Sequence, residues 1–163
     1  MAYNFNADEI FEMAIKIEEN GAAFYKKAAN LQKEEANKVF LNQLAKMEDN
    51  HKTSFERMRK ELSEMEKSGT VFDPQDELGL YLAAMADAHG GEGDPKVADS
   101  LTENQPMRDI LNIAIGLEKE SILFYLGLKD LLPPKYGQDK VDDIIKEEKK
   151  HIAQLNTFIK KLN

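Results

Sequence analysis

Two short Glu-x-x-His motifs stand out, because both of their side-chain types bind metals in proteins. They are Glu48–His51 and Glu148–His151, and they lie 100 residues apart. Residues three positions apart on a helix lie on the same face, so each motif would present a carboxylate and an imidazole together. Oxygen and imidazole ligands suit iron or manganese. A single motif is a weak signal, but a repeated pair indicates a metal site.

The repeat extends beyond these motifs. Residues 14–25 and 114–125 are identical at 5 of 12 positions without a gap, where ordinary composition gives roughly 6–8% per position by chance. Glu18 and Glu118 are among the matching residues, as are Tyr25 and Tyr125. The chain therefore carries a duplicated segment, and Glu18 and Glu118 join the two motifs as candidate metal ligands.

The elements that must position these residues are predicted to be four helices. Asn6 and Glu9 form a capping-box pattern before the first helix, and Thr102, Gln105 and Pro106 mark the start of the third. Runs of β-branched residues with a period of two are absent. We therefore predict an all-α protein with helices at 7–31, 34–68, 103–132 and 139–163.

Residues 68–103 differ in composition from the rest, since they hold five of the nine glycines and two of the five prolines. A connection this long in a compact domain has a topological role, here to join two helices that run the same way. Residues 77–89 could form a short helix within it. We predict a single domain over 1–163 with the ferritin-like four-helix bundle topology: hairpin 7–67, crossover 68–103 and hairpin 104–162.

All six candidate ligands fall in the stripes that the helices should bury. In the first hairpin, Glu18 and Glu48 are equidistant from residue 33 in the turn, so Glu18 should face the Glu48–His51 pair; the second hairpin repeats this arrangement around residue 133. Four buried carboxylates at one level need compensating charge, and these stripes hold no lysine or arginine. Two divalent metal ions would supply it.

The overall composition excludes several other functions. The chain has 22 Lys+Arg against 30 Asp+Glu, a net charge of −8, which opposes binding to nucleic acid or to an anionic membrane surface. It has no cysteine, which excludes disulfides, thiolate metal sites and a cysteine nucleophile. No apolar run approaches the length of a membrane span, and the start lacks a signal-peptide pattern. We expect a cytoplasmic protein.

Other polar residues near the candidate site have simpler interpretations. Tyr25 and Tyr125 lie seven residues after Glu18 and Glu118, on the same faces. Two alternatives remain equally open for these tyrosines: core packing alone, and a hydrogen-bonding or redox role in catalysis. Four further residues are expected on solvated surfaces: Glu19, His89, Glu120 and Glu147.

At the six candidate ligands the sequence resembles the rubrerythrin and ferritin-like diiron-carboxylate superfamily, over about 7–66 and 107–162. The resemblance implies that Glu48 and Glu148 bridge two iron ions. It further implies that Glu18 and Glu118 are terminal ligands and that each histidine binds one metal. Rubrerythrins commonly carry a further glutamate where this chain has Ser121. The lack of cysteine implies an erythrin-type domain without the rubredoxin domain of full-length rubrerythrins.

This resemblance implies an oxidoreductase of the peroxidase type, which reduces peroxide or dioxygen with electrons from an external electron-donor protein. Gly21 and Ser121 are small and lie on the site side of their helices, which leaves room for a small oxidant. Two alternatives stay open: iron sequestration without turnover, and a structural helical module whose site is vestigial or holds zinc. Manganese in place of iron, and assembly as a homodimer, also stay open.

Overall fold

The computed structural model describes residues 6–62, 77–86, 96–132 and 137–162. Within these ranges it contains helices but no strand, which confirms the predicted all-α class. The helices are listed here with their bounds: α1 Ala7–Asn30, α2 Glu35–Lys60, α4 Glu77–Ala86, α5 Lys96–Asp99, α6 Met107–Leu131 and α7 Gln138–Lys161.

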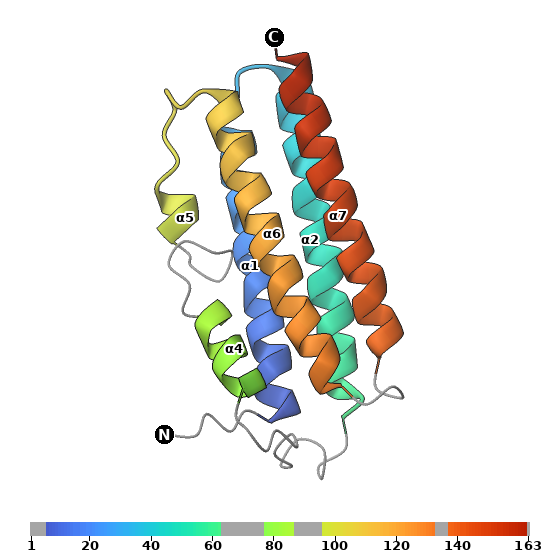
Figure 1. The fold of residues 1–163 in the computed structure, drawn as a ribbon. Helices are drawn as coiled ribbons and strands as arrows, with labels where there is room; N and C mark the ends of the chain where they lie inside the picture. Colours follow the sequence, from blue (N-terminus) through green and yellow to red (C-terminus); the bar gives the residue numbers. More distant parts are fainter. Residues whose placement is uncertain (1–5, 63–76, 87–95, 133–136, 163) are drawn as a thin grey trace.

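Four long helices form a bundle of two antiparallel hairpins, α1 with α2 and α6 with α7 (Figure 1). Helices α2 and α6 run in the same direction, so the chain between them returns along the length of the bundle (Figure 1). This is the predicted ferritin-like bundle topology. Within the crossover, α4 packs against α6 and α5 packs against α1. The predicted boundary between residues 67 and 68 lies outside the described residues.

Local sequence explains where α1 and α7 begin. The predicted capping box at α1 is confirmed, since the backbone N–H of Glu9 donates to Asn6 Oδ1 at 2.9 Å and that of Asn6 donates to Glu9 Oε2 at 3.0 Å. Gly137 precedes α7 with φ of 105°, a conformation that glycine adopts without steric cost. A Cβ at this position would also lie 2.9 Å from Met58 Sδ, so another residue there would be strained by the positive φ and would displace the Met58 side chain.

The predicted start of the third long helix is wrong by four residues. Thr102 and Gln105 instead close a separate turn, in which the Gln105 N–H donates to the Thr102 carbonyl at 3.2 Å. Pro106 is the N-cap of α6, with φ of −58° and ψ of 140°. A residue before proline is disfavoured in the helical region, which explains why the helix begins after Gln105. Helix α2 also ends earlier than predicted, at Lys60.

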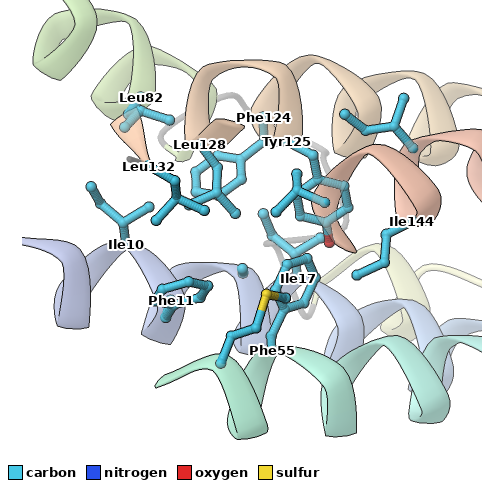
Figure 2. Close-up of a cluster of buried hydrophobic side chains, with 14 of the residues drawn as sticks. Ile10, Phe11, Ile17, Phe55, Leu82, Phe124, Tyr125, Leu128, Leu132 and Ile144 are labelled. Carbon is cyan, nitrogen blue, oxygen red and sulfur yellow. The ribbon is translucent and has the colours of Figure 1, made fainter. Parts of the chain in front are cut away.

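The buried apolar side chains form two clusters, one toward each end of the bundle. One cluster gathers Phe11, Phe55, Phe124 and Tyr125 between the four long helices (Figure 2). On every long helix, residues of one cluster precede the candidate ligands and residues of the other follow them. The candidate ligands therefore form a polar layer between two apolar cores. No helix in the described ranges is long and apolar enough to span a membrane.

The packing of α4 on α6 depends on the absence of a side chain at Gly127. A Cβ there would lie 2.6 Å from Tyr81 Cε1 and 3.1 Å from Leu82 Cδ2. The Tyr81 ring cannot swing aside freely, because its hydroxyl donates to the Leu123 carbonyl.

We expect Gly127→Ala to destabilise the fold by about 1–3 kcal/mol through overpacking. Gly116→Ala on the same helix is the control, because a Cβ there meets nothing within 4 Å, and it should stabilise by up to about 1 kcal/mol. Urea unfolding of both variants measures the difference. Equal effects of the two substitutions would contradict the described contact between α4 and α6.

Candidate metal centre

The six predicted ligands converge in the middle of the bundle. All four glutamates and His151 have an exposed fraction of 0%, and His51 of 3%. They come from all four long helices, as the sequence predicted: Glu18 from α1, Glu48 and His51 from α2, Glu118 from α6, Glu148 and His151 from α7. The rings of His51 and His151 lie stacked, with centroids 5.7 Å apart and an interplanar angle of 20°.

The six side chains form two groups that could each hold a metal ion. One group is Glu18, Glu48, His51 and Glu148, and the other is Glu48, Glu118, Glu148 and His151. In each group, one ligand atom per residue lies within 4.8 Å of all the others. Glu48 and Glu148 belong to both groups. The geometry therefore offers two adjacent metal positions with two shared carboxylates.

Two tyrosines connect the hairpins at this layer. The Tyr25 hydroxyl donates to Glu118 Oε1, and the Tyr125 hydroxyl donates to Glu18 Oε1. Each tyrosine thus orients the glutamate of the opposite hairpin. The Tyr125 ring also packs against Phe55, with centroids 5.0 Å apart. Of the two alternatives that the sequence left open, core packing alone is therefore wrong, because both tyrosines also donate a hydrogen bond to the centre.

Five carboxylate oxygens of the centre accept no well-formed hydrogen bond in the described part of the chain, although imidazole nitrogens lie close to several of them. The five oxygens are Glu18 Oε2 and both side-chain oxygens of Glu48 and Glu148. A buried polar atom without a partner costs about 1–3 kcal/mol, so such a cluster in a native protein requires an explanation. Metal ions would satisfy these oxygens. The donor set of four carboxylates and two imidazoles fits iron or manganese.

Both imidazoles point Nδ1 toward the centre. His51 Nδ1 lies 3.1 Å from Glu148 Oε1 and 3.5 Å from Glu18 Oε2. His151 Nδ1 lies 2.8 Å from Glu148 Oε2 and 3.3 Å from Glu48 Oε1. In the tautomer with its proton on Nε2, each Nδ1 lone pair would face the site as a ligand.

The electrostatics show that the layer needs positive charge. Burial, and then the charge of Glu148, raise the pKa of Glu118 to about 8. Burial likewise raises the pKa of Glu18 and of Glu48. Burial lowers the pKa of His51, but the adjacent carboxylates outweigh it and raise this pKa to about 12. Without metal, protons must therefore supply part of the charge that the carboxylates require.

Two of the residues expected on solvated surfaces have further features: Glu147 is partly exposed but contacts a candidate ligand, and Glu120 is half-buried. The Glu147 carboxylate contacts the outer ring nitrogen of a candidate ligand, since its Oε2 lies 2.7 Å from His51 Nε2. Helical periodicity missed this contact because the two residues lie on helices of different hairpins. Glu120 is half-buried, its Oε2 has no hydrogen-bond partner among the described residues, and burial raises its pKa.

The other residues singled out in the sequence near the candidate site have different outcomes. Glu19 does lie at the surface, where it pairs with Lys52 at 2.9 Å and with Lys16 at 3.4 Å. His89 lies outside the described residues. Ser121, in place of the additional glutamate of rubrerythrins, is buried and its hydroxyl donates to the Leu117 carbonyl at 3.1 Å.

Comparison with solved structures finds the same fold in another protein. A crystal structure from Thermotoga maritima, assigned as a ferritin-like diiron-carboxylate protein, superposes with a TM-score of 0.71 at 23% sequence identity. The match covers 98% of each chain. No family model and no curated protein matches the sequence. The chain therefore has the ferritin-like fold over nearly its whole length.

Metal removal should make the stability of this protein strongly dependent on pH. The pKa of Glu118 rises from 4.5 to about 8 on folding, so this group destabilises the fold progressively as pH increases from 4.5 to 8. Protonated His51, whose pKa rises from 6.5 to about 12, stabilises the fold below pH 6.5, and this contribution is lost as pH rises toward 12.

Both effects predict that the metal-free protein melts at a lower temperature at pH 8 than at pH 5. Bound metal stabilises the native state by mass action, and it binds best when the carboxylates are deprotonated. The difference in melting temperature between metal-loaded and chelator-treated protein should therefore be larger at pH 8. An unchanged melting curve after verified metal removal would exclude a buried di-metal site.

Proposed function

We propose that this protein is a diiron oxidoreductase that reduces peroxide or dioxygen. The observation that carries the proposal is the sharing of Glu48 and Glu148 between two adjacent groups of ligands. Two shared carboxylates would hold two metals close together, as in two-metal catalytic sites generally. The ferritin-like fold and the assignment of the Thermotoga maritima protein as a diiron-carboxylate protein support iron.

Two ferrous ions, when bound, would supply two electrons, which cleave the O–O bond of peroxide or, together with two protons, reduce dioxygen to peroxide. For peroxide, two electrons and two protons yield two molecules of water. The protein's own residues would bind the metals and exclude bulk water, since all six ligands are buried. Tyr25 and Tyr125 would hold the terminal carboxylates in place through their hydrogen bonds.

The oxidant should be small, and the electrons should come from a separate protein. Gly21 and Ser121 are both buried, and their small side chains would leave limited space beside Glu18 and Glu118. The 163 residues contain no cysteine, so no cysteine-ligated iron within them could pass electrons to the centre. We therefore include an external electron-donor protein among the expected partners.

The six ligands should act as one unit in metal binding. His51→Ala and His151→Ala should each lose about one metal per chain, because each histidine belongs to one group only. Glu48→Gln and Glu148→Gln should disturb both metals, because these residues belong to both groups. Metal analysis of purified variants measures the stoichiometry. His89→Ala is the control and should retain both metals; metal loss there but not in His151→Ala would contradict the assignment.

Turnover is tested by adding peroxide to the anaerobic, ferrous protein. We expect one peroxide consumed per two irons oxidised, a diferric optical band, and repeated turnover when a chemical reductant is present. In the His151→Ala variant, bound iron should still be oxidised, but the ratio of one peroxide consumed per two irons oxidised should be lost. Two bound irons without peroxide consumption would instead support iron sequestration, and bound zinc alone would support a structural site.

A further inference from the structure

The two histidines of the centre differ in what their outer nitrogens contact. His51 Nε2 lies 2.7 Å from Glu147 Oε2. His151 Nε2 is buried and has no hydrogen-bond partner among the residues that the structure describes. Both inner nitrogens face carboxylates of the centre, since His51 Nδ1 lies 3.1 Å from Glu148 Oε1 and His151 Nδ1 lies 2.8 Å from Glu148 Oε2. The clearest difference between the two histidines is therefore at their outer nitrogens.

The sequence repeat explains this difference. Glu147 directly precedes Glu148, and at the corresponding place before Glu48 the chain has Met47. The tyrosines of the layer keep the twofold relation, because their two hydroxyls donate to the opposite glutamates in the same way. A methionine thioether is only a weak acceptor. Met47 therefore cannot offer His151 Nε2 the strong carboxylate acceptor that Glu147 offers His51 Nε2.

A carboxylate that accepts the outer N–H of a metal-binding imidazole fixes its tautomer, orients its ring and increases its basicity. Glu147 is suited to this role, because 42% of its side chain is exposed and its charge stays partly hydrated. With the partners that the described residues offer, His151 would have to present Nδ1 to a metal with its buried Nε2–H unpaired, which is unfavourable.

We propose that Glu147 is a positioning residue that makes the two metal positions unequal, so that the position of Glu18 and His51 binds metal more tightly and is filled first. This inference rests on the proposed di-metal function. It concerns the order of loading and does not depend on whether the loaded protein reduces peroxide.

The test is an anaerobic calorimetric titration of the metal-free protein with Fe²⁺, repeated with Co²⁺. For the wild type we expect two steps whose affinities differ by about tenfold or more. Glu147→Ala should weaken the tighter step by roughly 10–100-fold, the usual effect of losing such a partner. Glu147→Gln keeps an acceptor oxygen and should recover part of the loss. Met47→Glu should strengthen the weaker step.

Three further variants make the assignment specific. His151→Ala should keep the tight step, whereas His51→Ala should keep only the weak one. Asp143→Asn is the matched control, because this carboxylate lies on the same helix, exposed and paired with Lys146, and both steps should be unchanged. A folded state for each variant is checked by circular dichroism.

The outcomes separate this inference from the proposed function. Two equal affinities in the wild type, or a Glu147→Ala variant that binds both metals as the wild type does, would overturn the inference alone. Two unequal steps without peroxide consumption would support the inference and contradict the oxidoreductase. A wild-type protein that binds neither Fe²⁺ nor Co²⁺ would overturn both.

Discussion

Four carboxylates buried at one level of a helical bundle are the constraint on which the rest of this structure depends. Removing an ion from water costs several kcal/mol even after the protein relaxes, and like charges at short distance add to that cost. The two apolar clusters above and below the layer supply the burial that offsets this cost. Nearly every polar contact within the layer serves to orient or neutralise these carboxylates.

The hydrogen bonds of Tyr25 and Tyr125 determine which oxygens remain free for a metal. They occupy Oε1 of Glu118 and Oε1 of Glu18, and this leaves Oε2 of each directed at the centre. Glu48 and Glu148 receive no such bond in the described part of the chain, so both oxygens of each stay available. The difference between terminal and shared carboxylates is therefore built into the protein itself.

Much of this arrangement could be predicted from the sequence, because it depends on periodicity and on the repeat. Glu18 and Glu48 fall in buried stripes at equal distances from a turn, and an antiparallel hairpin then brings them together. The predicted start of α6 is wrong because the capping pattern at Thr102 and Gln105 belongs to a separate turn, and Pro106 disfavours the helical conformation at Gln105.

The contact of Glu147 could not be predicted from one helix at a time. A helical pattern assigns a residue to a face of its own helix, but Glu147 reaches His51 on α2 of the other hairpin. The mismatch between Met47 and Glu147 at equivalent positions of the repeat was the available signal. Departures from an internal repeat mark places where the two halves of a site have different roles.

Neither hairpin contains a complete centre, since each group of ligands takes one shared glutamate from the other hairpin. A chain of half this length could still build the same centre by pairing with a second copy of itself. In such an ancestor, any substitution would appear in both halves at once, and a carboxylate beside one histidine would accompany the other too. Joining two copies in one gene removes that restriction. Two equivalent positions, such as 47 and 147, can then come to hold different residues.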